Sequence, residues 1–164
     1  MSRSHVEWGC ALLLACTPTL NWRSVSLGHL STLLPCKPDE ASRKVTLANT
    51  PVVMDMLGCE AGGTVFTVSR IQAPDATQAS ALLAALRQAS LQTVQAGVVQ
   101  PQPNSGDQHS SLDLQAEGRN PQGQPLQARF KWLLAGAEVY QLAAYGAQLT
   151  GLQTDNLTQE ARLQ

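Results

Sequence analysis

Charged residues are scarce in this chain of 164 residues: they make up 14% of it, well below the quarter that is usual in globular proteins. The formal net charge is −1, and Arg and Lys are scattered, so we expect no basic surface that attracts a phosphate backbone. No apolar run reaches the roughly 18 residues that a membrane-spanning helix needs. These shortages argue against nucleic-acid binding and against a transmembrane helix.

Sequence signatures of catalysis and metal binding are also missing. No Gly-x-Ser-x-Gly elbow presents a nucleophile, and no Cys-x-x-Cys or His-x-x-x-His spacing could hold a metal ion. The pair Gly62–Gly63 is not followed by the Lys and Ser/Thr of a P-loop, so we expect a turn there. His29 and His109 are isolated and are expected on the surface or at a strand end. The sequence thus predicts no catalytic residues, no cofactor and no metal site.

The first 16 residues have the layout of a secretory signal. Arg3 supplies a positive charge, the stretch Gly9–Ala15 is largely apolar, and a small residue stands just before Cys16. Leu13–Cys16 resembles the lipobox of bacterial lipoproteins. That resemblance implies that Cys16 becomes the first residue of the mature chain and carries the lipid.

Two residues depart from the lipobox pattern: Glu7 interrupts the start of the apolar stretch, and Leu14 is bulkier than the residue often found there. Plain secretion, and a buried first strand or helix over residues 6–16, are the alternatives. On the lipoprotein interpretation, residues 1–15 are a signal peptide, residues 16–20 are a short tether, and residues 21–164 form a single domain. The apolar fraction of 43% and the chain length suit one domain with its own core.

The cysteines agree with export. Cys10 would leave with the signal and Cys16 would be acylated, which leaves Cys36 and Cys59 as an even pair in an oxidising compartment. Each of the two lies beside a turn residue at the edge of an apolar run. We therefore expect a Cys36–Cys59 disulfide that pins the first half of the domain. Two free buried thiols are the alternative.

Alternating and β-branched runs predict five strands in the first half of the chain, separated by Gly and Pro. They cover residues 22–27, 30–34, 43–48, 52–57 and 64–68. Asp55 is expected in solvent on the opposite face from Met54 and Met56. Asp39 and Glu40, beside Pro38, are expected in a solvated turn.

One long helix is predicted next. Asp75 is a suitable N-cap, and Gln78 follows three residues later as in a capping box. Apolar residues then recur at steps of three and four, and Gly97 is expected to end the helix. This stripe consists of Ala79, Leu82, Leu83, Leu86, Ser90 and Val94. Residues 98–108 are expected to form a loop.

Three strands of an antiparallel meander are expected to follow, over residues 111–117, 126–134 and 139–145. Apolar residues alternate with polar ones, so we expect one face buried and the other in water. Asp113, Gln127, Arg129 and Lys131 fall on the expected outer face. Asp155 is expected to cap a last helix over residues 157–163.

Strands, a long helix, a meander and a terminal helix describe an α+β layered sandwich built on an antiparallel sheet. The order resembles the PsbP-like fold, which is shared by the extrinsic photosystem II protein, a yeast Ran-binding import factor and many small bacterial envelope proteins. Pro35–Pro38 resembles the Pro-x-x-Pro that ends an early strand in that pattern. Ala128–Phe130 and Tyr140–Leu142 are similar to its Arg-Phe/Tyr and Tyr-x-Leu strands. The resemblance covers residues 21–163 and implies no catalytic residues.

Such domains usually close with a paired aromatic and a final short strand, and Glu160–Gln164 is expected to supply neither. We expect a non-enzymatic lipoprotein of the bacterial cell envelope, anchored to a membrane through Cys16 and facing the periplasm. Its domain would bind or scaffold another envelope component of unknown identity. The alternatives are a periplasmic carrier of a small ligand or metal, with a pocket between the long helix and the sheet, and a thiol-redox protein.

Overall fold

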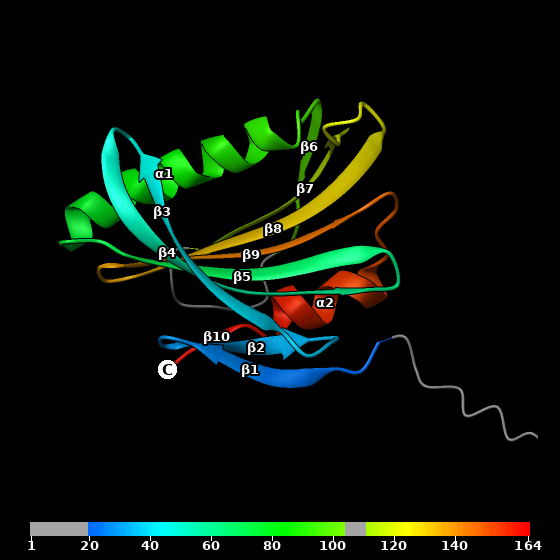
Figure 1. Cartoon of the computed structure of the whole chain (residues 1–164), viewed down its shortest axis with the longest axis horizontal. Helices are drawn as coiled ribbons and strands as arrows, with labels where there is room; N and C mark the ends of the chain where they lie inside the picture. The colour runs from blue at the N-terminus through cyan, green and yellow to red at the C-terminus, as the bar shows by residue number, and fades with distance from the viewer. Residues whose placement is uncertain (1–19, 104–110) are drawn as a thin grey trace, which may run out of the picture.

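The structure is a computed structural model that describes residues 20–103 and 111–164. The signal peptide and lipobox predicted over residues 1–16, most of the predicted tether over residues 16–20, and His109 lie outside this range. The described chain is α+β and mostly strand, with a seven-stranded sheet, a three-stranded sheet and two helices. Both sheets are antiparallel throughout, and they form separate layers (Figure 1). The expected α+β class is confirmed.

The seven-stranded sheet brings the two halves of the chain together at its centre. β5 pairs with β9, so the last strand before the long helix lies beside the last strand of the meander. In spatial order the sheet consists of β3 (Asp39–Leu47), β4 (Thr50–Ala61), β5 (Thr64–Gln72), β9 (Glu138–Gly146), β8 (Pro125–Ala135), β7 (Ser111–Arg119) and β6 (Val98–Pro101).

The small sheet joins the two ends of the described chain. β1 (Arg23–Leu27) pairs with β2 (Leu30–Leu34), and β10 (Arg162–Leu163) pairs with the other edge of β2. The prediction that the chain lacks a closing strand is therefore wrong. β10 can be only two residues long because β2 is already ordered by its pairing with β1, and β10 adds to its other edge with Arg162 opposite Ser31.

The helix α1 (Ala76–Thr93) covers one face of the large sheet (Figure 1). Asp75 is its N-cap as predicted, because the Asp75 carboxylate accepts a hydrogen bond of 2.8 Å from the backbone N–H of Gln78. The buried residues of the helix, Ala79, Leu82 and Leu86, pack into a core that contains Phe130 and Trp132 of β8. The predicted stripe is thus the packing face of the helix.

The opposite face of the large sheet is covered by the small sheet and by α2 (Gly151–Gln159). Their side chains, with Leu30 and Leu157 among them, pack on Phe66 and Leu142 of the large sheet. The central strands β8 and β9 are therefore buried on both faces, and the prediction of a half-wet meander is wrong.

Double coverage also corrects the placement of four polar residues. Asp113, Arg129 and Lys131 are only 3%, 4% and 1% exposed, and Gln127 is partly buried. The alternation of faces along β7 and β8 is as predicted. The alternation of apolar and polar residues predicts which face of the sheet a side chain occupies. It does not predict whether a helix later in the chain covers that face.

The end of α1 and the segment that follows it differ from the prediction. α1 ends at Thr93, and Gln95 rather than Gly97 takes the left-handed conformation, with φ of 50°. The N–H groups of Gln95 and Ala96 then bond back to carbonyls of the last turn, as in a Schellman motif. Residues 98–101, expected in a loop, form β6 because they pair with β7.

The last helix lies earlier than predicted. It begins after Thr150, whose backbone N–H donates to the side chain of Gln153, and it ends at Gln159. Asp155 does not cap it but lies within it, 3.8 Å from the Arg129 guanidinium. The strands β3, β4 and β5 are likewise longer than the expected runs, and Asp39 and Glu40 belong to β3 rather than to a turn.

The end of α1 packs directly on the backbone of β7 at Gly118. Arg119 donates its N–H to the Val94 carbonyl over 2.8 Å, and a Cβ on Gly118 would lie 1.9 Å from that carbonyl oxygen. We predict that Gly118→Ala destabilises the fold by about 1–3 kcal/mol, because the helix must move away from the strand. The check is the free energy of unfolding in urea.

Gly97→Ala is the matched control for this variant. A Cβ at Gly97 meets nothing within 4 Å, so we expect a change in stability close to zero. Equal unfolding free energies for the two variants would contradict the close approach at Gly118.

Candidate functional site

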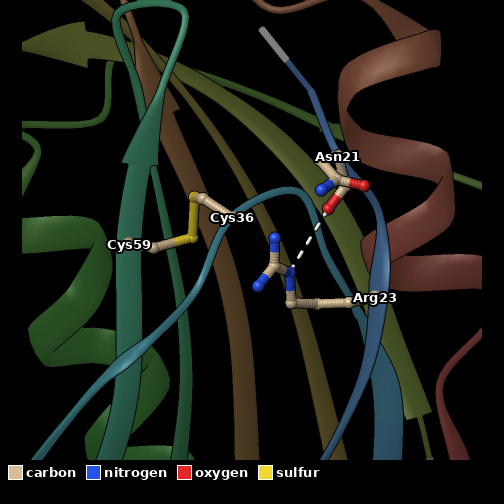
Figure 2. The surroundings of a disulfide bond; sticks show 4 residues. All are labelled: Asn21, Arg23, Cys36 and Cys59. Carbon is tan, nitrogen blue, oxygen red and sulfur yellow. Dashed lines mark hydrogen bonds between the residues drawn. A yellow bond between two sulfur atoms is a disulfide. The ribbon is translucent and has the colours of Figure 1, made fainter. Parts of the chain in front are cut away.

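The disulfide predicted from the sequence is present. Cys36 lies just before β3 and Cys59 lies in β4, with an S–S distance of 2.00 Å and a Cα–Cα distance of 5.9 Å (Figure 2). The Cα separation is typical of protein disulfides. The bridge therefore joins the start of β3 to the strand that β3 pairs with, and the alternative of two free thiols is wrong.

The segment that leads into β1 lies beside this bridge. The N–H of Asn21 donates to the carbonyl of Pro35 over 2.7 Å, and Arg23 donates to the carbonyl of Asn21 over 3.5 Å (Figure 2). The Trp22 ring meets the ring of Phe66 edge-on, with 6.0 Å between centroids. We call this region (Asn21, Trp22, Pro35, Cys36 and Cys59) the disulfide corner. It is where the chain that follows Cys16 joins the fold.

A second polar cluster ties the small sheet to the large one. The Glu138 carboxylate, 8% exposed, pairs with His29 Nδ1 at 2.7 Å and accepts from Arg70 Nε at 3.0 Å and from the Tyr140 hydroxyl at 2.8 Å. His29 also donates its backbone N–H to Tyr140 Oη over 2.9 Å. We call these four residues the Glu138 cluster. Because His29 lies in the turn between β1 and β2, the cluster fixes that turn on β9.

The Glu138 cluster sets the protonation of its carboxyl group. Burial disfavours the ionised form of Glu138, but the hydrogen bonds from His29, Arg70 and Tyr140 outweigh it and lower the pKa of Glu138 to about 2. Burial raises the pKa of the Tyr140 hydroxyl. The cluster is therefore an ionised carboxylate held by three donors, beside a hollow of about 520 Å³ that His29 and Glu138 help to line.

A third polar cluster lies beneath α2. Arg129 holds Asp113 through two hydrogen bonds, of 2.6 and 2.9 Å, and its guanidinium lies 3.5 Å from the hydroxyls of Thr154 and Thr158. The Lys131 ammonium donates to the carbonyl of Thr158 over 2.9 Å. That carbonyl belongs to the last turn of α2, where a helix has no backbone partner of its own. The buried cations therefore hold the helix on the sheet.

The positions singled out in the sequence do not meet in one place. Asp55 is half exposed, accepts from Ser42 Oγ at 2.8 Å and lies 3.7 Å from Arg70. His29 is exposed as expected, but its Glu138 partner was missed. Glu138 follows the Gly136 turn, just before the predicted strand, and nothing in the local sequence signals that it is buried.

Two further observations concern the chemistry that the described residues offer. In residues 20–103 and 111–164, no three His, Cys, Asp or Glu side chains gather as a metal-binding group. Within the same ranges, neither helix is both long and apolar enough to cross a membrane. The sequence matches no protein-family model and no curated protein.

We predict that removing the bridge destabilises the domain. The disulfide joins two cysteines that are 23 positions apart and so restricts the unfolded chain. Replacing both Cys36 and Cys59 by Ser removes this restriction, and the chain-entropy model then predicts a loss of about 3 kcal/mol in the free energy of unfolding. Urea unfolding followed by tryptophan fluorescence measures the loss. Thr77→Ser, on the exposed side of α1, is the control, since it changes the domain and leaves the bridge closed. An unchanged unfolding midpoint in the double variant would contradict the bridge.

Stability should also depend on pH through Glu138. Its pKa is about 2 in the folded state against an ordinary value of 4.5, so the stabilisation is complete above about pH 4.5 and is lost as the pH falls towards 2. The lowered pKa corresponds to a loss on the order of 3 kcal/mol across that window. We predict that Glu138→Gln flattens the pH dependence of the unfolding free energy between pH 4.5 and 2.

The control for this experiment is Glu60→Gln, which removes an exposed carboxylate from β4. If the wild type, Glu138→Gln and Glu60→Gln lose stability in parallel as the pH falls, the Glu138 cluster does not stabilise the fold as its geometry indicates.

Proposed function

We propose that this chain is a non-enzymatic lipoprotein of the bacterial cell envelope, attached to a membrane through lipid on Cys16 and facing the periplasm. Its domain binds or scaffolds another envelope component. The observation that carries the proposal is the Cys36–Cys59 disulfide, because such bridges form and persist in oxidising compartments. The disulfide and the lipobox-like Leu13–Cys16 both favour export of the domain to the periplasmic side of the membrane.

The disulfide corner supports the anchoring part of the proposal. Four residues separate Cys16 from Asn21, and the steps between these two residues span at most about 17 Å when fully extended. A lipid on Cys16 would hold the disulfide corner close to the bilayer. The bond from Asn21 to Pro35 and the packing of Trp22 on Phe66 secure the chain at this point, next to a covalent crosslink.

The order of elements supports a PsbP-like domain. Hairpins precede α1, the meander of β7, β8 and β9 follows it, and α2 and β10 close the chain. Ala128–Phe130 lies in β8 and Tyr140–Leu142 in β9, the two strands to which the resemblance assigned them. Such a domain is proposed here as a binding module, without a catalytic role.

The other two functions have less support. A carrier with its pocket between α1 and the sheet would need free space where Leu82, Leu86, Phe130 and Trp132 pack as a core. A thiol-redox protein would favour cysteines close in sequence, whereas these two are 23 positions apart and join neighbouring elements as a crosslink would. Native mass spectrometry tests carriage, because a bound ligand adds its mass.

The proposal is tested by the intact mass of the mature chain extracted from its native membrane. We predict loss of residues 1–15, an added diacylglycerol mass on Cys16 and a loss of two hydrogens for the disulfide. Cys16→Ser should leave the chain without the added mass. Cys10→Ser is the matched control, because it makes the same substitution at the other cysteine of the leader and the mature chain should still carry the lipid. Recovery of the wild type as a soluble chain without lipid would overturn the anchor and favour plain secretion.

A further inference from the structure

The strand β3 is a long open edge of the large sheet. It pairs with β4 on one side, and no described strand pairs with its other side. Its nine residues include no proline, and Asp39–Lys44 are all exposed. An edge of this kind offers a row of unpaired N–H and C=O groups to another strand.

The opposite edge of the sheet is different. β6 has four residues, ends in Pro101, and carries no charged side chain. Short length and proline are two devices by which proteins prevent strands from adding to a sheet. The large sheet is thus closed to further strands at β6 by short length and proline. At β3 only charged side chains, another such device, protect the edge, and these still admit a strand of complementary charge.

The turn after β3 determines which backbone groups face outwards. Ala48 and Asn49 both have positive φ, of 49° and 58°, as in a two-residue type I′ hairpin turn. Leu47 and Thr50 flank this turn and are directly paired, so Leu47 and every second residue before it bond to β4. The remaining residues, including Glu40, Ser42 and Lys44, direct their N–H and C=O groups to the open edge.

The charges along this edge suit a second copy of the same strand. Acidic residues occupy its first part and basic residues its middle. In an antiparallel pair centred on Ser42, Glu40 of each copy lies opposite Lys44 of the other, on the same face of the sheet. Shifting the centre to Ala41 places Asp39 opposite Arg43 instead. Parallel pairing in register would place like charges side by side, which is unfavourable.

We propose that two copies of this chain associate through antiparallel β3 edges, about a two-fold axis at Ser42. The two large sheets then form one continuous sheet, in which Ser42 of each copy bonds to Ser42 of the other and Glu40 lies opposite Lys44. This interface does not depend on the function proposed above, because it uses only the edge and its charges.

The Cys36–Cys59 disulfide keeps the start of the β3 edge ordered. Cys59 is bonded to Cys36 and lies next to Gly58, which pairs with Asp39 at the start of β3. The acidic part of the edge is therefore held in strand geometry by a covalent bond before any partner arrives. An edge that is already ordered loses less conformational entropy when it pairs.

Charge reversal tests the interface in the full-length chain by sedimentation equilibrium. The dimer contains two equivalent contacts between residues 40 and 44. Glu40→Lys and Lys44→Glu each place like charges opposite one another at both contacts, so each should raise the dissociation constant of the dimer about tenfold or more. The double variant Glu40→Lys/Lys44→Glu should restore wild-type association. Arg87→Glu, an equal charge change on the exposed side of α1, should leave the dimer unchanged.

A crosslinking experiment tests the register. In an antiparallel bonded pair the two Cα atoms lie about 5.5 Å apart, within disulfide reach, so Ser42→Cys should give a crosslinked dimer on a non-reducing gel. Thr46→Cys, exposed on the same strand, would stand about 27 Å from its counterpart and should not crosslink.

Three outcomes would overturn the proposal. One is a wild-type chain that remains monomeric at all concentrations. Another is a single charge reversal that leaves the dimer as strong as the Arg87→Glu control. The third is a Ser42→Cys chain that crosslinks no more than Thr46→Cys does, or that crosslinks to a different protein, which would assign the edge to another partner.

Discussion

The structure depends on the central strands of the large sheet, β8 and β9, being covered on both of their faces. On one face, α1 packs on Phe130 and Trp132 of β8; on the other, α2 packs over Arg129 and Lys131 of the same strand. Two cations are thereby taken out of water, which is costly unless they find partners. Asp113 and the hydroxyls and carbonyl of α2 provide partners, so the helix and the buried charges require one another.

The same principle operates at smaller scale where α1 meets the sheet. Gln141 is buried in the centre of β9, and its side-chain oxygen accepts from Trp132 Nε1 and from Ser90 of α1, each at 2.7 Å. The one polar residue in the apolar stripe of α1 is therefore not a fault in the pattern. It fixes the position of the helix along the sheet, because apolar contacts alone would tolerate a small slide.

Local patterns predicted the parts of the fold that depend on neighbouring residues. The strand runs, the Asp75 cap and the apolar stripe of α1 follow from spacing, and the Cys36–Cys59 bridge followed from turn residues and cysteine count. Residues whose surroundings come from distant segments were placed wrongly. Lys131 is buried by a helix that begins twenty residues later, and the Glu138 cluster joins residues 29, 70, 138 and 140. β6 is a strand because β7 pairs with it, although its own sequence reads as a loop.

The pairing of β10 with β2 has a consequence for synthesis and turnover. Leu30 and Leu34 become buried in a core that also contains Leu157 and Ala161, so the apolar face of the β1–β2 hairpin is not fully covered until residues 157–163 have been made. An incomplete polypeptide, cut short before α2, would present an apolar hairpin and the bare Phe66 face of the sheet to its surroundings. Proteases that recognise exposed apolar segments would thus distinguish such a fragment from the folded domain.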